Sequence, residues 1–278
     1  MLHHLRKCAA VGLLAAVAGA QIQPVVTDEQ GNGNVDWSAR VIVATGIGAP
    51  NPDLPEAAQR PSAERAAQQI ALRNALETVK GIFINSSTTV ENFMTKSDVI
   101  TSRVSGFVKG FQQKGRTRYM SDGSVEITME IPIDGFGYLG EMIIGEQLGD
   151  KPAVTAFEGK KSKEEHIFTG LIIDCRGLGV KPALSPRVLD GSGREVYGSA
   201  YVTKEWAVKY GIVGYSKDIA AAAKLDRVGK KPGQIKAEKA IGDNKTDVAI
   251  ADADAEDIRS AAKNLKFLSE CRVIFVVD

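Results

Sequence analysis

The clearest periodic pattern in the chain is a strict alternation of apolar and polar residues between positions 125 and 133. The apolar side chains occupy the odd positions, namely Val125, Ile127, Met129, Ile131 and Ile133. Successive side chains of a strand point to opposite faces of a sheet, so this segment is predicted to be a strand with one face on a core and one in water. The turn sequence Asp122-Gly123 just before it predicts a hairpin with the segment 107–119.

A pattern with a helical period begins near residue 62. Small apolar residues recur at every fourth position, at Ala63, Ala67, Ala71, Ala75 and Val79. Residues four apart share one face of a helix, and a row of alanines lets that face lie close to its neighbour. We expect Ser62 to be the N-cap and Gly81 to end the helix. The β-branched segment 39–46 predicts a preceding strand, and the proline-rich segment between them predicts a loop.

Periodicity is lost and charge is concentrated between residues 149 and 165, which we interpret as a linker between two domains. After it, "HIFTGLIIDC" and "CRVIFVVD" are apolar runs typical of central strands. The segment "GQIKAEKAIGDNKTDVAI" predicts two strands around a turn. Residues 251–268 predict an amphipathic helix whose apolar face holds Ile258, Ala261, Ala262, Leu265 and Leu268.

These elements predict an α+β protein with two domains, each a mostly antiparallel sheet with helices packed on one face. The first domain is expected at residues 37–148 and the second at 166–278. Residues 21–36 are polar and rich in glycine and asparagine, and we expect them to form a flexible leader.

The composition restricts the kinds of molecule that this protein is expected to bind. Of the 278 residues, 44% are hydrophobic and 25% are charged, which is ordinary for a globular chain. Lysine and arginine number 35 and aspartate and glutamate 34, so the formal net charge is +1, without a long block of one sign. This balance argues against binding to nucleic acid or to an anionic membrane surface.

Residues 1–20 have the pattern of a secretory signal peptide. Arg6 and Lys7 precede an apolar run from Cys8 to Ala20, which ends in the small residues Ala18-Gly19-Ala20. The alternative is a short buried helix at the N-terminus. Cys8 starts the apolar run instead of following it, so we predict an exported chain that is not lipidated. We expect no transmembrane segment in the mature chain.

Removal of this peptide would leave one histidine, His166, and two cysteines, Cys175 and Cys271. That inventory excludes a histidine-rich zinc site, and no cofactor or metal is expected. The two cysteines form a disulfide only if the apolar runs beside them are antiparallel neighbours. Otherwise they are two buried, unpaired thiols.

The motif "TGIGAPNPD" resembles a nucleotide-binding loop, but a proline-broken segment separates Gly48 from the predicted helix, so its dipole cannot act on a phosphate there. We therefore expect its glycines to serve close backbone approach. "DADAED", from Asp252 to Asp257, lacks the glycine and glutamate of a calcium loop and is better explained by helix capping. His166 has no nucleophile motif to act with. No enzyme is predicted.

Three aromatic residues lie in a segment rich in glycine and proline, namely Tyr197, Tyr201 and Trp206. Such residues can form a contact surface with another subunit. The alternative is a turn-rich edge of the fold with ordinary core aromatics.

The stretch from Trp37 to about residue 135 resembles the twenty-kilodalton envelope lipoprotein (LPP-twenty) family and the related N-terminal domain of flagellar assembly protein T. The likeness lies in "VATGIGAP", in the alanine-rich helix that runs into Gly81, and in the closing alternating strand. The resemblance implies an exported domain of the outer envelope that assembles into rings, discs or cell-surface complexes, without known catalysis.

Two functions are therefore expected. The first is an exported, non-catalytic structural or assembly protein of the bacterial cell envelope, in the periplasm or associated with the outer envelope. It would act through contacts with other envelope proteins or by self-association into an oligomer, as an accessory of a flagellar or another outer-envelope complex. The alternative is a periplasmic module that binds a small ligand between its two domains.

Overall fold

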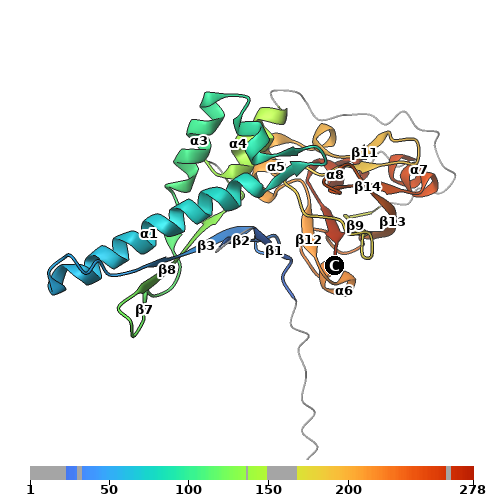
Figure 1. The fold of residues 1–278 in the computed structure, drawn as a ribbon. Coiled ribbons are helices and arrows are strands. Elements are labelled where there is room, and N and C mark those ends of the chain that lie inside the picture. Colours follow the sequence, from blue (N-terminus) through green and yellow to red (C-terminus); the bar gives the residue numbers. More distant parts are fainter. Residues whose placement is uncertain (1–22, 30–32, 136, 149–167, 261–263) are drawn as a thin grey trace, which may run out of the picture.

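The computed structural model describes residues 23–29, 33–135, 137–148, 168–260 and 264–278. Residues 1–20, 149–165 and His166 lie outside the described residues, so the predicted signal peptide and linker stay predictions. The expected α+β class is confirmed, and a first domain extends as an arm from a second domain (Figure 1). The elements of the first domain are β1 (Val26–Glu29), β2 (Gly33–Asp36), β3 (Val41–Gly48), α1 (Glu56–Gly81), β4 (Phe83–Asn85), β5 (Thr88–Thr89), α2 (Val90–Met94), α3 (Asp98–Val108), β6 (Gln112–Gln113), β7 (Arg118–Tyr119), β8 (Val125–Pro132) and α4 (Leu139–Leu148).

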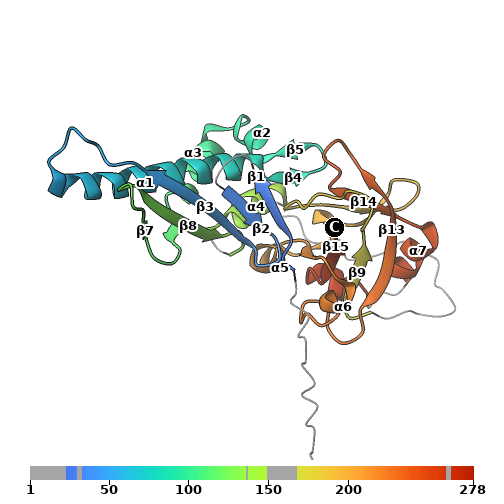
Figure 2. The same cartoon turned by 60° about the horizontal axis from the view of Figure 1, so that its bottom comes forward.

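The main sheet of the first domain is antiparallel in the order β1-β2-β3-β8-β6, and β7 also pairs with β8. The strand predicted at residues 125–133 is confirmed, because its odd positions are buried and its even positions are not. The hairpin is confirmed as well, since the Met120 amide donates to the Ser124 carbonyl at 2.9 Å and Arg118 is opposite Glu126. Helix α1 covers one face of this sheet (Figure 2).

The close seat of α1 on β3 confirms the role predicted for the alanine row and the glycines. All five residues of the row are fully buried. A Cβ atom added at Gly46 would overlap the carbonyl oxygen of Ala67 and the amide nitrogen of Ala71, and one at Gly48 would overlap the carbonyl of Ala63. These glycines face α1, and the absence of a Cβ atom at each lets β3 and α1 approach closely.

The start of the first domain corrects two predictions. The expected flexible leader contains the hairpin of β1 and β2, which extends the sheet and buries Val25 and Val35. Val26, next to the buried Val25, is 41% exposed, so apolar and buried positions do not coincide and the alternation is hidden in the sequence. Helix α1 begins at Glu56 after an N-cap at Pro55, not at Ser62, and contains Pro61 in its second turn. Packing against the sheet outweighs the backbone hydrogen bond that this proline removes.

The second domain is built on one seven-stranded sheet in the order β11-β10-β14-β13-β9-β15-β12. Strands β12, β15, β9 and β13 run parallel to one another, whereas β14 is antiparallel to β13 and β11 to β10. This sheet is thus mixed, not mostly antiparallel as expected. The elements are β9 (Leu171–Asp174), β10 (Val188–Leu189), β11 (Glu195–Tyr197), the 3-10 helix η1 (Ser199–Tyr201), α5 (Lys204–Tyr210), β12 (Gly214–Ser216), α6 (Ile219–Ala222), β13 (Gly233–Ile241), β14 (Asp247–Ile250), α7 (Asp252–Ser260), α8 (Asn264–Ser269) and β15 (Val273–Val276).

Both faces of the second sheet are covered, which corrects the prediction that helices pack on one face only. Alternate residues of β9 and β15 point to opposite faces: Ile172 and Ile274 form a small core with Ala222 of α6. Leu171 and Phe275 belong instead to the main core, together with residues of α7 and α8. Burial on both faces explains why these strands are continuously apolar.

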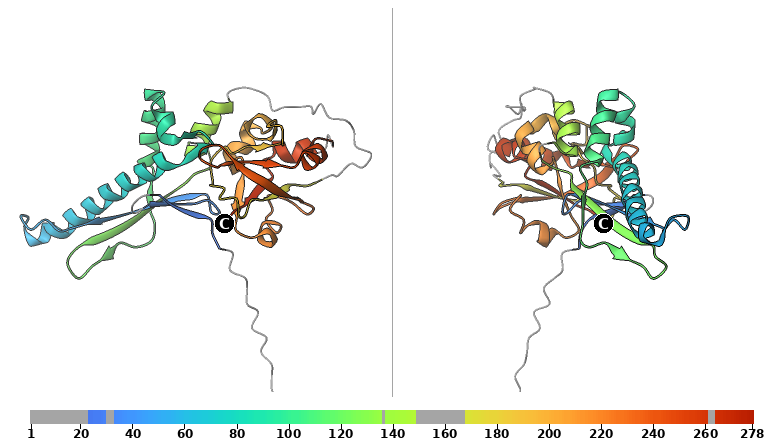
Figure 3. Two further views of the ribbon diagram at one scale, coloured as in Figure 1. Left: turned by 45° about the vertical axis from the view of Figure 1, so that its right-hand side comes forward. Right: turned by 90° about the vertical axis from the view of Figure 1, so that its left-hand side faces the viewer.

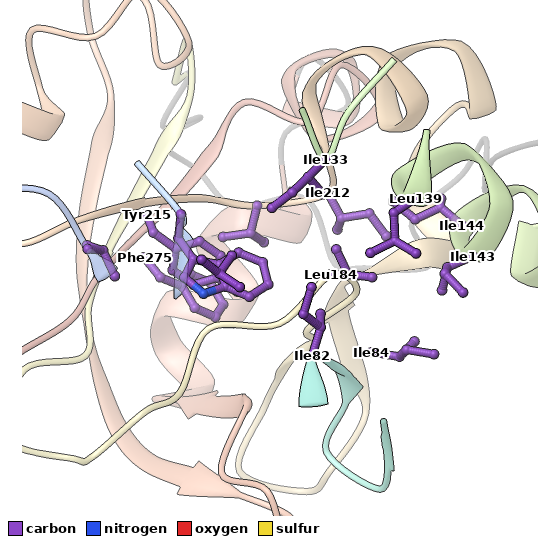
Figure 4. Packing of buried hydrophobic residues seen from close by; sticks show 14 of the residues in the cluster. Ile82, Ile84, Ile133, Leu139, Ile143, Ile144, Leu184, Ile212, Tyr215 and Phe275 are labelled. Carbon is purple, nitrogen blue, oxygen red and sulfur yellow. The ribbon is translucent and has the colours of Figure 1, made fainter. Parts of the chain in front are cut away.

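The two domains share a single hydrophobic cluster (Figure 4). Ile82 and Ile84, at the end of α1 and in β4, lie near Leu184 of the second domain (Figure 4). The Leu184 amide donates to the Phe83 carbonyl at 2.9 Å, and the Ser86 hydroxyl donates to the Asp247 carboxylate at 2.8 Å. The arm therefore has a fixed attachment, and it extends away from the second domain in the left view of Figure 3.

A mostly buried ion pair of the first domain lies beside this attachment, next to Gly211 of the second domain. Arg40 Nε and Nη2 donate to the two Asp134 carboxylate oxygens at 2.6 and 2.7 Å, with side chains 13% and 10% exposed. Burial lowers the pKa of Arg40, but the adjacent Asp134 charge more than offsets this and the pKa is raised. The neighbouring Gly135 amide donates to the Val208 carbonyl of the second domain at 2.9 Å. Within the described ranges, no helix combines the length and the apolar character that a membrane span needs.

Candidate functional site

A groove of about 710 Å³ lies between α3 and α4, with the start of α5 at one side. It is the candidate site because both domains contribute residues to it. The alternative function, binding of a small ligand between the two domains, predicts a site of this kind. The residues that line it are Arg103, Gly106, Phe107, Gly110, Ile131, Gly137, Tyr138, Glu141, Met142 and Lys204. Its volume lies within the range of ordinary small-molecule sites, about 300–1,000 Å³.

Two glycines of α3 and its C-terminal turn create the hollow. A Cβ atom at Gly106 would meet no atom within 4 Å, so the missing side chain leaves open space. At Gly110, four residues later, an added Cβ would lie 3.3 Å from the Ile131 side chain on the floor of the groove. The Phe107 ring packs edge-on against Tyr138, with 6.5 Å between centroids and 90° between planes. The floor and one wall are therefore apolar and aromatic.

Charged groups surround this apolar lining. Within the described part of the chain, the ion pair of Arg103 is a long one with Glu146, at 3.9 Å, and both side chains are 55% exposed. The Glu141 carboxylate accepts a hydrogen bond from the Gly137 amide near the start of α4. Among the residues that the structure describes, none forms an ion pair with Lys204. The groove thus has two cationic groups whose charge is weakly compensated.

A second, smaller hollow of about 190 Å³ lies beside α5. Trp206 and Tyr210 are stacked there, with 5.3 Å between ring centroids and 21° between planes. The Arg227 guanidinium donates to the carbonyls of Cys271, Tyr210 and Gly211 at 2.6–2.8 Å. Burial lowers the pKa of Arg227. Because these bonds tie the ends of α5 and α8 together, we assign Arg227 to the support of the fold.

The predicted aromatic contact surface does not form as a unit. Tyr197 is fully buried and its hydroxyl donates to the Ile212 carbonyl at 2.6 Å, so its assignment to a surface was wrong. Burial raises the pKa of Tyr197. Tyr201 is half-buried and donates to the Glu195 carbonyl at 3.0 Å. Trp206 lines the smaller hollow and is the member nearest to the expectation.

Of the two alternatives for the cysteines, the structure has the two free, buried thiols and not the disulfide. The strands beside the cysteines are neighbours, but β9 and β15 run parallel. Cys175 follows the end of β9, whereas Cys271 precedes the start of β15. At 3.3 Å per residue this puts them roughly 20 Å apart along the strands, far beyond disulfide reach. Burial raises the pKa of Cys271 to about 12 and that of Cys175 further.

The acidic segment at Asp252 lies at the start of α7 as expected for capping. The Asp252 carboxylate accepts a hydrogen bond from the Gly191 amide at 2.9 Å, and burial raises the pKa of Asp254. Across the described part of the chain, no group of three or more histidine, cysteine, aspartate or glutamate side chains could hold a metal.

The second domain has a recognisable relative among protein families. Residues 170–278 match the family described as Treponema pallidum Tp0624, second domain. The match begins one residue before β9 and ends with the chain, so it spans the whole mixed sheet and less than half of the protein. No curated protein matches the chain. These comparisons make the second domain similar to that family and leave the resemblance of residues 37–135 to the LPP-twenty family as a prediction.

Sequence reasoning missed the groove and its cations Arg103 and Lys204. The available signal was the pair Gly106 and Gly110, four residues apart at the end of a helical segment. Lys204 carries no local signal, because only the packing of the two domains brings α5 beside α4.

Proposed function

We propose that this protein is an exported, non-catalytic structural or assembly protein of the bacterial cell envelope, which acts through protein contacts. It would be located in the periplasm or at the outer envelope without a lipid anchor, as an accessory of a flagellar or another envelope complex. The observation that supports this most is the arm of the first domain, whose sheet has α1 on one face and an open opposite face (Figure 2).

The open sheet face presents apolar groups along β3. Since Gly46 and Gly48 face α1, the alternate residues of β3 point the other way, namely Val41, Val43, Thr45 and Ile47. Ile47 is 44% exposed, and its partner in β8, Glu126, is held by an ion pair with Arg118. An apolar stripe beside charged side chains is the usual composition of a protein contact surface.

The rigidity of the arm supports the same function. A surface on β3 is held by the close seat of α1, and the arm is attached to the second domain through the shared core and through hydrogen bonds such as that from Ser86 to Asp247. A pre-organised surface loses little conformational entropy when a partner binds. The signal peptide pattern and the LPP-twenty resemblance agree with an envelope location.

Substitution of Ile47 by aspartate tests this function. The new carboxylate would be opposite Glu126 on a face that we propose to be buried by a partner, so recovery of envelope partners by crosslinking should fall at least fivefold. Leu225→Asp is the matched control, because Leu225 is 42% exposed on the second domain, away from the arm. Equal recovery by the two variants, or a cytoplasmic location on fractionation, would overturn the proposal.

The second candidate function is the binding of a small ligand, and the groove between α3 and α4 favours it. Its lining combines apolar side chains with a few charged groups, which could fix the orientation of a ligand. A thermal-shift screen with envelope metabolites tests this candidate. A ligand at roughly 100 times its Kd would add about 2.7 kcal/mol of stability. The absence of any shift across the screen would contradict it.

A further inference from the structure

We infer that the groove between α3 and α4 binds an anionic single-chain amphiphile, a ligand with one carboxylate head and one unbranched alkyl chain. This inference rests on the second candidate function and specifies the chemistry of its ligand. Three features carry it: two weakly paired cations, an apolar floor, and open space at Gly106.

The cations define the charge of the ligand head. Among the described residues, the ion pair of Arg103 is the 3.9 Å contact with Glu146, and Lys204 has none. The two cations line the groove from different helices, α3 and α5. The lining holds these two cations and one carboxylate, that of Glu141, which leaves it a net charge of +1. The lining therefore favours an anion over a cation.

The apolar floor defines the body of the ligand. Ile131, Phe107 and Met142 are contributed by β8, α3 and α4, and together they offer an alkyl chain a continuous apolar surface. Contact with an alkyl chain removes apolar area from water at about 25 cal/mol per Å².

A head-group series tests the charge preference with the chain held constant. Decanoate, decan-1-ol and decyltrimethylammonium are titrated below their micellar concentrations into the purified protein by isothermal calorimetry. We expect decanoate to bind at least tenfold more tightly than the alcohol, and the ammonium compound to bind most weakly. Raised salt should weaken decanoate binding more than alcohol binding, because only the former uses ionic contacts.

Variants locate the binding. Because exposed ion pairs are individually weak, Lys204→Gln and Arg103→Gln should each weaken decanoate binding by about 1.4- to fivefold and leave alcohol binding unchanged. Lys109→Gln is the matched control, since it removes a charge from the end of α3 outside the lining. Gly106→Leu fills the hollow and should weaken decanoate and decan-1-ol at least tenfold, whereas Gly106→Ala should have little effect.

The outcomes separate the inference from the function on which it rests. Equal affinity for the three head groups, with loss in Gly106→Leu, overturns the anionic preference and keeps the groove as a ligand site. Binding that is unaffected in Gly106→Leu overturns the assignment to this groove. If none of the three compounds binds, the inference that the ligand is an amphiphile is overturned. The metabolite screen then tests the ligand-binding function separately.

Discussion

Substitution of Gly46 by alanine should destabilise the protein by about 2–3 kcal/mol, the upper part of the usual range for overpacking. The added methyl group would overlap two backbone atoms of α1, the Ala67 oxygen and the Ala71 nitrogen. A flexible side chain could rotate away, but backbone in the middle of a helix can only move with the whole helix. Such a movement would also separate the buried alanine row from the sheet. Addition of a nucleotide should change the stability of neither the parent protein nor the Gly46→Ala variant.

Urea unfolding, followed by circular dichroism, measures this effect as a lower midpoint with an unchanged slope. Gly106→Ala is the control, because a Cβ there meets nothing within 4 Å. That helical substitution should stabilise by about 0.5–1 kcal/mol. If Gly46→Ala were within about 0.5 kcal/mol of the parent protein, the size expected of a neutral surface change, the close seat of α1 on β3 would be refuted.

Three further predictions follow from buried groups. Asp134→Asn should cost about 3 kcal/mol by thermal or urea unfolding, because it leaves the mostly buried Arg40 without its counter-charge; an effect below about 1 kcal/mol would contradict the role of this pair. Reductant should not change the unfolding midpoint, since Cys175 and Cys271 are free; a lower midpoint would reveal a disulfide. Burial raises the pKa of Cys271 from 9.0 to about 12, so the unfolded thiol ionises first. The contribution of the buried, protonated Cys271 thiol to the free energy of unfolding is complete below pH 9. It is lost as the pH rises towards 12, at up to about 1.4 kcal/mol per pH unit. Cys271→Ala should reduce that slope in urea unfolding at pH 8–10.

Local patterns predicted the first domain well. The alternation at 125–133 and the alanine row of α1 each follow from one buried face, so the sequence alone carries them. The hairpin β1–β2 was not predicted, because it buries few residues, among them Val25 and Val35. The direction of β9 and β15 was not predictable from their composition, although their continuous apolar character was a signal for a sheet covered on both faces.

The candidate site was predicted less well, since it depends on contacts between distant segments. Arg103 and Lys204 come together only through the packing of α4 on α5, which no local period encodes. Tyr197 shows the opposite failure: its glycine-rich neighbourhood suggested exposure, yet its hydroxyl finds a buried carbonyl partner at Ile212. Because the Tyr197 hydroxyl has a hydrogen-bond partner inside the protein, this side chain can be buried without losing a hydrogen bond.

The central claim, that the open face of the arm contacts an envelope partner, is tested most directly by photo-crosslinking in intact cells. A photoreactive amino acid is placed at Ile47 and, in a separate protein, at Leu225, two apolar positions of nearly equal exposure at 44% and 42%. The account predicts a discrete crosslinked product with an envelope protein, or with a second copy of this chain, from position 47 and not from position 225. No product from position 47, or the same product from both positions, would contradict it.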